Sequence, residues 1–247
     1  MSVGVADGAR QWLHEGAGGA QASTTLIPVI LALMAEAGLQ LSQLDTIAFG
    51  RGPGSFMGLR TACAVAQGLA VGARVPVLPV DTLLALAEEA RTQVQSPSGV
   101  ITALLDARMD EMYVQQFRLQ AGLMTALAPG RLLRPEALAA ELADTAQAGA
   151  NSHWLVGNVF DVYAGRLPAW PETQTLRALP TAAAMLRLAP TLLEAGHAVP
   201  AAHALPLYIR NKVALTTAER TQIKEDQARA ALALQPLEVK QALDAAP

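Results

Sequence analysis

The predicted strands and helices of this chain occur twice in the same order. Two strands that meet at Asp7-Gly8 are followed by a helix, a strand, a second helix, a short strand and a third helix. From Gly99 onwards, two strands are again followed by a helix, a strand, a short helix, a brief strand and a last helix, which Pro190 is placed to break. Strands that alternate with helices form a sheet covered by helices, so the sequence predicts a duplicated α/β fold.

Turn signals set the limits of the two halves. The cluster "SPSG" at residues 96–99 separates the two series of elements. We therefore expect an N-terminal lobe over residues 1–97, which carries the partner-binding helices described below, and a C-terminal lobe over residues 98–213. Residues 214–247 contain polar and alanine-rich stretches with little periodicity, and we expect them to form a flexible tail.

Charge and cysteine content exclude several function classes. The net charge is −3 and only three of the 18 basic residues are lysines, which argues against a chain that grips a nucleic acid alone. The single cysteine, Cys63, excludes an internal disulfide and is typical of a reducing cytoplasm. The chain start lacks a signal-peptide pattern, and no stretch reaches the ~18 charge-free apolar residues of a membrane helix. We expect a cytoplasmic protein without membrane contact.

Residues that could hold a metal or perform catalysis are scattered. The four histidines show no metal-ligand spacing, and Cys63 has no second thiol nearby in the sequence. Asp106, Asp110 and Glu111 cluster at a predicted strand turn, where they would either bind a cation or, as we favour, lie on a solvated hairpin. The sequence therefore predicts no metal site and no catalytic residue.

A glycine-rich turn joins a predicted buried strand to a predicted helix. It contains Gly50, Gly52, Pro53, Gly54 and Ser55. Such a turn at a helix N-terminus exposes backbone N–H groups and attracts anions. It matches neither the P-loop, nor the G-x-G-x-x-G fingerprint, nor the G-x-S-x-G elbow of hydrolases. Residue types leave two interpretations open, a tight structural turn and a phosphate contact.

Two predicted helices have more apolar surface than one core requires. Residues 24–37 contain Glu36 as their only charge, and residues 56–71 contain only Arg60. The second helix has one apolar stripe with 3-4-3-4 spacing, formed by Phe56, Leu59, Cys63, Ala66 and Ala70. A helix on a sheet needs one such stripe, whereas a helix that is apolar on most sides is covered on most sides. Either a thick internal core or a partner protein would cover these helices.

Long motifs in the chain resemble the bacterial TsaB family, the subunits for tRNA threonylcarbamoyladenosine biosynthesis. They are "GRGPGSFMGLR", "AQGLA", "VPVLPVDTLLALA", "LLDARMDEMYVQQF" and "PLYIRNKVALTTAER". In the first motif, Met57 replaces the usual threonine. The resemblance extends from about Ser2 to about Glu219. It implies an actin-like ATPase (ribonuclease H-like) fold with two similar lobes and a cleft between them.

The resemblance also implies a function and a set of partners. The chain would be a non-catalytic scaffold that pairs with the catalytic paralogue TsaD, which modifies the adenosine beside the anticodon in tRNAs reading codons that begin with A. The ATPase TsaE would join the pair, the chain would also form a homodimer, and tRNA would be contacted only indirectly. No cofactor is required, and a weak ATP or ADP contact in the complex is left open. Both pairings are expected to use the two apolar helices, through Leu26, Ile30, Met34, Phe56, Leu59, Arg60, Cys63 and Gln67.

Two departures from the family pattern restrict the chemistry. Family members usually begin with a strand and an Asp-Thr-Ser turn before the segment that matches residues 2–8, so the first strand of lobe one is expected to be missing. The family's His-Ser-Glu at the first helix is replaced by Ala22-Ser23-Thr24. We therefore interpret the glycine turn as a vestigial nucleotide loop that mainly sets the angle between strand and helix. The alternatives are a stand-alone ATP-dependent phosphotransferase and a peptidase of the same superfamily, and neither finds its catalytic groups here.

Overall fold

The computed structural model describes residues 1–210 apart from 20–21, 95, 97 and 147–151. Met1–Ile209 form one compact unit. The tail predicted at 214–247 and residues 211–213 of the predicted C-terminal lobe lie outside the described residues.

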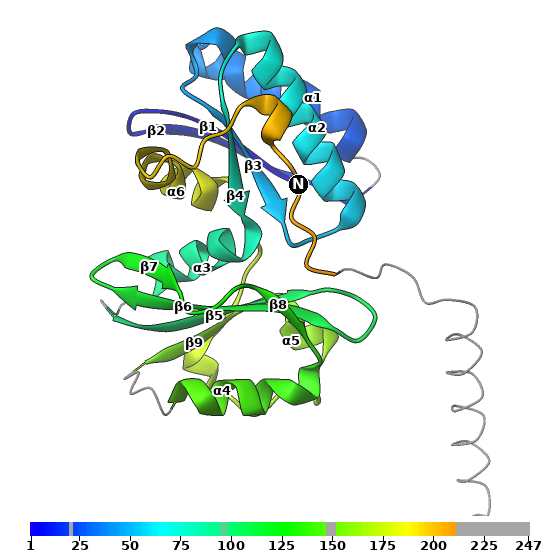
Figure 1. The fold of residues 1–247 in the computed structure, drawn as a ribbon, viewed down its shortest axis with the longest axis vertical. Coiled ribbons are helices and arrows are strands. Elements are labelled where there is room, and N and C mark those ends of the chain that lie inside the picture. Colours follow the sequence, from blue (N-terminus) through cyan, green and yellow to red (C-terminus); the bar gives the residue numbers. More distant parts are fainter. Residues whose placement is uncertain (20–21, 95, 97, 147–151, 211–247) are drawn as a thin grey trace, which may run out of the picture. The chain divides into compact units, whose positions relative to one another are not determined.

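The first lobe contains two separate pairs of strands and two long helices (Figure 1). β1 (Ser2–Asp7) and β2 (Arg10–Glu15) form an antiparallel hairpin. β3 (Ile47–Gly52) and β4 (Val77–Asp81) pair in parallel, as expected for strands joined by a helix. The helices are α1 (Ala22–Ala37) and α2 (Phe56–Ala73), with the short 3₁₀ turn η2 (Leu41–Gln43) after α1.

The second lobe has one continuous six-stranded sheet. Its order is β10-β9-β5-β6-β7, and β8 also pairs with β6. The strands are β5 (Ser98–Asp106), β6 (Met112–Gln120), β7 (Leu123–Ala126), β8 (Arg131–Leu133), β9 (His153–Gly157) and β10 (Thr175–Arg177). The other elements are α3 (Thr82–Gln93), η3 (Pro135–Ala137), α4 (Leu138–Ala146), α5 (Val159–Val162), η4 (Glu172–Gln174), α6 (Ala182–Glu194) and η5 (Ala201–His203).

The helices do not all pack on the sheet of their own half of the chain. Buried side chains of α3, among them Leu83 and Leu86, pack against β5 and β6 of the second sheet. Conversely, Ala184 of α6 packs with Leu78 and Val80 of β4 in the first lobe. Each half of the chain thus supplies one helix that packs on strands of the other half.

The sequence prediction was wrong at the last helix and incomplete in the second sheet. α6 runs unbroken through Pro190, which lies shortly before its end at Glu194. β7 and β8 were not predicted, because each is only three or four residues long. Asp81 does cap α3 as predicted, since its side chain accepts hydrogen bonds from the N–H groups of Leu83 and Leu84.

The strand pairs of the two lobes share their directions. In the second lobe, the central β5 pairs antiparallel with β6 on one side and parallel with β9 on the other. In the first lobe, one pair is antiparallel and the other parallel, but no strand joins them among the residues that the structure describes. The fold is thus duplicated α/β, as the sequence predicted.

Candidate protein-binding site

The buried stripe of α2 packs inside its own lobe. Leu59, Cys63, Ala66 and Ala70 are its buried residues, and the last three pack with Phe49 of β3 and Val77 of β4. The segment around η5 covers the same side. The Cys63 Sγ lies 3.3 Å from the Ala204 carbonyl, and the Gln67 amide donates to the carbonyls of Ala201 and Ala204 at 3.0 Å. Burial also raises the pKa of the Cys63 thiol. This part of the stripe therefore serves the internal core.

Helix α1 packs its inner face on the β1–β2 hairpin. Leu33 and Met34 are buried with Val3 and Val5 of β1. Leu26 and Ile30 are half-buried beside the same cluster. The inner face of α1 is thus also occupied by the lobe's own strand.

The eight predicted partner-binding residues consequently lie at different depths. Three are buried, namely Met34, Leu59 and Cys63. Three are half-buried, namely Leu26, Ile30 and Gln67. Phe56 and Arg60 are exposed. Phe56 and Arg60 are therefore accessible to a partner. For the other six residues, the role in partner binding stays a prediction.

Phe56 and Arg60 form a surface cluster with Tyr208. The Arg60 guanidinium carbon lies 4.1 Å from the centre of the Phe56 ring, a cation–π geometry. The Phe56 and Tyr208 rings are 5.5 Å apart, and the Arg60 Nε lies 3.4 Å from the Tyr208 hydroxyl. The cluster thus combines two aromatic rings and one arginine, residue types that are enriched at protein interfaces.

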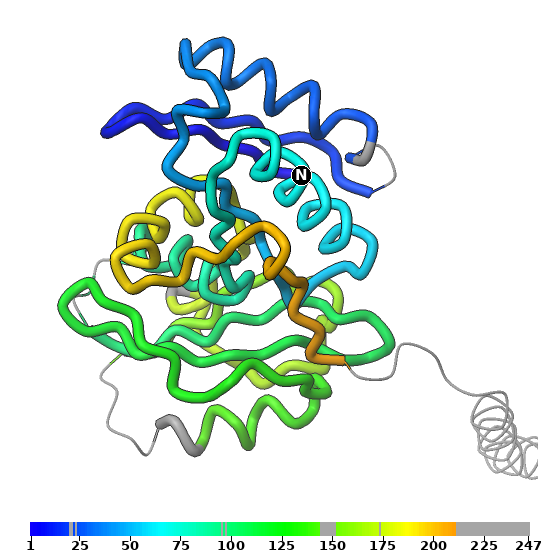
Figure 2. The backbone as a smooth tube through the Cα atoms, turned by 45° about the horizontal axis from the view of Figure 1, so that its top comes forward, coloured from blue at the N-terminus to red at the C-terminus, as the bar shows by residue number. Residues whose placement is uncertain are grey.

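Four further apolar side chains on the same two helices are exposed. Ile27 and Leu31 of α1 are 45% and 50% exposed, and Met57 and Val71 of α2 are 67% and 68% exposed. Helices α1 and α2 lie next to each other in both views (Figures 1 and 2). We call the exposed set the α1–α2 face, formed by Ile27, Leu31, Phe56, Met57, Arg60 and Val71. Sequence reasoning chose the periodic stripe and missed the residues between its members, although these were equally apolar.

Helix α2 also has the length and composition of a membrane-crossing helix. Its 18 residues have a mean hydropathy of 1.2, and it is the one such helix among the described residues. Core helices share these properties, and the stripe that packs on β3 gives α2 a place in the core.

The glycine turn is covered by a later segment of the chain that contains Leu207. Gly52 has φ +120°, and a Cβ built there would lie 2.5 Å from the Leu207 carbonyl oxygen, so no larger residue fits. The Leu207 N–H donates to the Arg51 carbonyl at 2.6 Å, and the Gly52 N–H donates to Thr82 Oγ1 at 3.0 Å. Pro53 is buried, Gly50 and Gly54 are half-buried and Ser55 is exposed. Two backbone groups of the turn thus have partners within the protein.

The acidic cluster after β5 is a hydrogen-bonded hairpin. The Tyr163 hydroxyl donates to Asp106 Oδ1 at 2.8 Å and to the Glu111 carbonyl at 2.9 Å. Burial and the bond to Asp106 raise the pKa of Tyr163 to about 12. Arg166 pairs with Asp110 at 2.8 Å and with Glu136 at 2.7 Å. No cluster of three or more acidic, His or Cys side chains in the described part of the chain could hold a metal ion.

Comparison with known proteins places this architecture in a family. Residues 18–218 match the family model described as TsaD, tRNA N6-adenosine threonylcarbamoyltransferase. A tRNA threonylcarbamoyladenosine biosynthesis protein TsaB from Haemophilus influenzae is 34% identical over 191 residues, which cover 76% of this chain and 79% of that protein. The TsaB of Escherichia coli is 31% identical over 200 residues, which cover 76% and 80%.

Solved structures support the same assignment. An uncharacterized Pseudomonas aeruginosa protein with similarity to the peptidase YeaZ superposes with a TM-score of 0.74 at 36% identity, covering 85% of this chain and 94% of that one. YeaZ from Pseudomonas aeruginosa gives a TM-score of 0.70 at 34% identity, covering 84% and 93%. These matches and the duplicated sheets fit the actin-like, ribonuclease H-like ATPase fold. The chain belongs to the TsaB family of tRNA threonylcarbamoyladenosine biosynthesis proteins.

Proposed function

We propose that this chain is a non-catalytic subunit in tRNA threonylcarbamoyladenosine biosynthesis that binds the catalytic subunit TsaD through its α1–α2 face. The role in this pathway follows from membership of the TsaB family. The observation that carries the proposed interface is the exposure of Ile27, Leu31, Met57 and Val71 on two adjacent helices. Exposed apolar side chains grouped on one face mark protein-interaction sites.

The composition of the face favours a protein partner. Its only charged side chain is Arg60, which is held against Phe56 at 4.1 Å. Interface centres are depleted in charge and enriched in aromatic residues, methionine and arginine. Ala64 and Gly68, both exposed on α2, would let a partner helix approach closely.

Contacts of this chain with nucleotide and tRNA are expected to be minor. The glycine turn, with its backbone groups partly used by Leu207 and Thr82, serves mainly to position α2, and any ATP or ADP contact in the complex is weak. TsaE would join the pair, a homodimer would compete for the same face, and the chain would contact tRNA only indirectly in the cytoplasm. No catalytic residue or cofactor of its own is needed for this role.

Binding of the purified chain to TsaD, measured by calorimetry, tests the proposal. Met57→Glu is expected to weaken binding at least tenfold, because a carboxylate would be desolvated in the interface centre. Leu123→Glu in β7 is the matched control, since Leu123 is also 67% exposed but lies outside the α1–α2 face.

Both variants alter exposed side chains, so circular dichroism should show both folded. Equal affinities of Met57→Glu and Leu123→Glu for TsaD would refute the proposed face. An absence of binding by the unchanged chain would refute the pairing itself.

A further inference from the structure

After its last long helix, the chain returns along α2. Val199 follows α6 and pairs with Val77 of β4, since their backbone groups exchange hydrogen bonds of 2.9 and 2.8 Å. From there the chain runs beside α2 (Figures 1 and 2) to Ile209, which packs on the core of the second lobe. We call Val199–Ile209 the strap.

Two side chains of α2 contact the first part of the strap. The Gln67 amide donates to the carbonyls of Ala201 and Ala204 at 3.0 Å each, and the Cys63 Sγ lies 3.3 Å from the Ala204 carbonyl. Because these contacts use backbone carbonyls of the strap, they fix its path over the helix. The half-buried Gln67 side chain is therefore engaged with the strap.

The glycine turn and the second lobe fix the last part of the strap. The Leu207 N–H donates to the Arg51 carbonyl at 2.6 Å, and a Cβ built on Gly52 would lie 2.5 Å from the Leu207 carbonyl oxygen. Ile209 packs on the core of the second lobe. Tyr208 thus lies between two neighbours that are each anchored elsewhere in the protein.

The strap follows one row of side chains on α2. Phe56, Arg60, Cys63 and Gln67 are spaced i, i+4, i+7 and i+11, so they lie on one side of the helix. The strap meets this row in reverse order, because its first residues bind Gln67 and Cys63 while Tyr208 contacts Arg60 and Phe56. The strap thereby brings Tyr208 to the beginning of α2.

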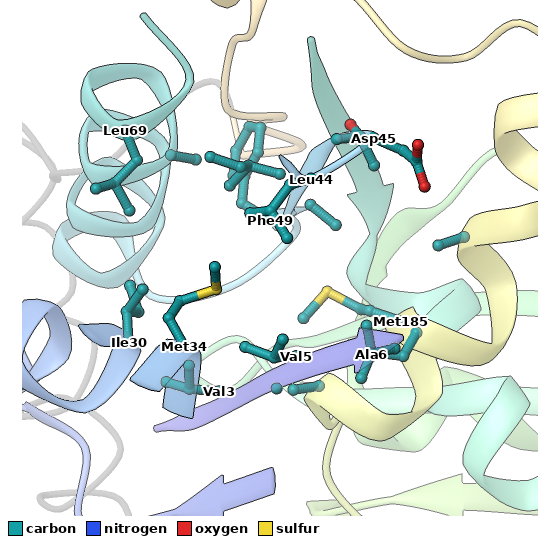
Figure 3. Close-up of a pocket in the computed structure, with 18 of the residues that line it drawn as sticks. Val3, Val5, Ala6, Ile30, Met34, Leu44, Asp45, Phe49, Leu69 and Met185 are labelled. Carbon is teal, nitrogen blue, oxygen red and sulfur yellow. The ribbon is translucent and has the colours of Figure 1, made fainter. Parts of the chain in front are cut away.

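Another side of α2 faces a cavity. Ala62, Val65 and Leu69 line a space of about 520 Å³, together with side chains of α1 and β1 (Figure 3). By helical spacing, Met57 lies on neither the cavity row nor the strap row, and it is 67% exposed. The part of α2 in the α1–α2 face therefore borders on the cluster of Phe56, Arg60 and Tyr208.

Arg60 can bind a further group. In the described part of the chain, its Nε is its only hydrogen-bonding group with a partner, the Tyr208 hydroxyl at 3.4 Å, and Arg60 forms no ion pair there. The terminal N–H groups of a guanidinium match the two oxygens of a carboxylate. The rings of Phe56 and Tyr208, 38% and 43% exposed, lie beside this guanidinium, and apolar surroundings strengthen an ion pair.

We propose that Phe56, Arg60 and Tyr208 bind an acidic side chain of TsaD, and that Gln67 is a positioning residue that holds the strap so that Tyr208 completes this contact. The inference rests on the proposed function, because it gives the α1–α2 face one polar recognition point. Charge complementarity selects an acidic group, since Arg60 is the only charge of that face.

Binding of the full chain to TsaD, measured by calorimetry at low and high salt, tests the acidic contact. Arg60→Met should weaken binding about fivefold at low salt, because an ion pair is lost. It should also remove most of the decrease in affinity that salt causes in the unchanged chain. The matched control is Arg118→Met in β6, which removes another exposed arginine outside the α1–α2 face and should change neither quantity.

A double-mutant cycle tests the positioning role of Gln67. Gln67→Met keeps the length of the side chain and removes both bonds to the strap, so it should weaken TsaD binding about threefold. In a chain that already carries Tyr208→Ser, it should cause no further loss, because Gln67 acts through Tyr208. Tyr208→Phe keeps the ring and should retain most of the affinity. Independent, additive effects of Gln67→Met and Tyr208→Ser would overturn the positioning role.

Met57→Glu separates this inference from the proposed function. If Met57→Glu weakens TsaD binding while Arg60→Met behaves like Arg118→Met, the proposed face stands and the acidic contact is wrong. If the unchanged chain does not bind TsaD, both are wrong. If Arg60→Met abolishes self-association in sedimentation and leaves the affinity for TsaD unchanged, a second copy of this chain is the occupant, and the inference is overturned.

Discussion

The two lobes use the same arrangement of strands and differ at the centre. In the second lobe, β5 fills the middle of the sheet, and Ile101, Ala103 and Leu104 have no exposed surface. In the first lobe, the corresponding position is a cavity of about 520 Å³. In the first lobe, α6 contacts β1 and β3 from one side, while α1 and α2 cover the other side. The first lobe thus has an open, apolar space between its two helical layers, whereas the second lobe is close-packed around β5.

The largest expected difference between the lobes concerns truncation of a buried side chain. Leu104→Ala at the centre of β5 should lower the free energy of unfolding by about 4 kcal/mol, because it leaves a cavity in a close-packed core. Met34→Ala should cost about 2 kcal/mol, since Met34 already adjoins the open cavity and loses fewer contacts. Urea unfolding followed by tryptophan fluorescence measures both. Equal losses for the two variants would contradict the claimed difference in packing.

The ion pairs between α3 and α6 connect the two lobes. Removing them should give the next largest loss in the free energy of unfolding. Arg187 of α6 contacts Glu88 at 2.9 Å and Glu89 at 2.8 Å, and Glu88 is almost fully buried. Arg187→Met should cost about 2 kcal/mol, because Glu88 then keeps only Arg91 as its partner. The matched control, Arg177→Met, removes an exposed pair with Asp161 and should cost less than about 0.5 kcal/mol in urea unfolding. A cost for Arg187→Met no larger than that of the control would mean that the pairs do not couple the lobes.

The same alanine-to-leucine change should alter the stability of the protein in opposite directions in the two lobes. Ala62→Leu on α2 extends into the cavity and should stabilise the protein by about 1 kcal/mol. Ala103→Leu in β5 has no such room and should destabilise it by about 2 kcal/mol through overpacking. Melting temperatures from calorimetry would rise for the first and fall for the second. A fall for both would show that the cavity closes in solution.

We also expect a pH dependence of stability that arises in the second lobe. His153 is buried, with its Nε2 2.7 Å from Thr102 Oγ1, and burial lowers its pKa from 6.5 to about 4. Below pH 6.5 the His153 side chain of the unfolded chain is protonated, whereas that of the folded chain stays neutral down to about pH 4. The contribution of His153 to the free energy of unfolding is therefore fully present above pH 6.5 and decreases as the pH falls from 6.5 to about 4. Each pKa unit corresponds to about 1.4 kcal/mol, and we expect a loss of about 1–3 kcal/mol by pH 4.

His153→Gln is the control for this pH dependence, because glutamine does not titrate. Its free energy of unfolding should lose the His153 contribution between pH 6.5 and pH 4. An equally steep decrease in the variant would assign the effect to other groups.

Local sequence signals predicted most elements because each depends on neighbouring residues. The apolar spacing from Phe56 to Ala70 predicted α2, and the position of Asp81 before an apolar run predicted the cap of α3. Short strands such as β7 and β8 escaped prediction, since three or four residues contain too little alternation. The unbroken α6 also escaped it, because a proline disfavours the interior of a helix but does not always end the helix.

The candidate site was predicted at the level of helices but not of side chains. Periodicity showed that α1 and α2 have excess apolar surface, and both helices do expose apolar residues. The periodic stripe, however, packs on β3, β4 and η5, and this leaves Met57 and Val71 outside. A spacing pattern shows which residues share a helix face, but it contains no information on what that face meets.

By itself, the sequence determined the family, the duplicated order of strands and helices and the Asp81 cap of α3, because all of these are properties of neighbouring residues or of long motifs. Only the tertiary structure decided that α3 and α6 cover each other's sheets, that Leu207 closes the glycine turn and that β1 and β3 flank a cavity. These features join residues far apart in the chain, and their positions follow from packing in three dimensions rather than from local conformational preference.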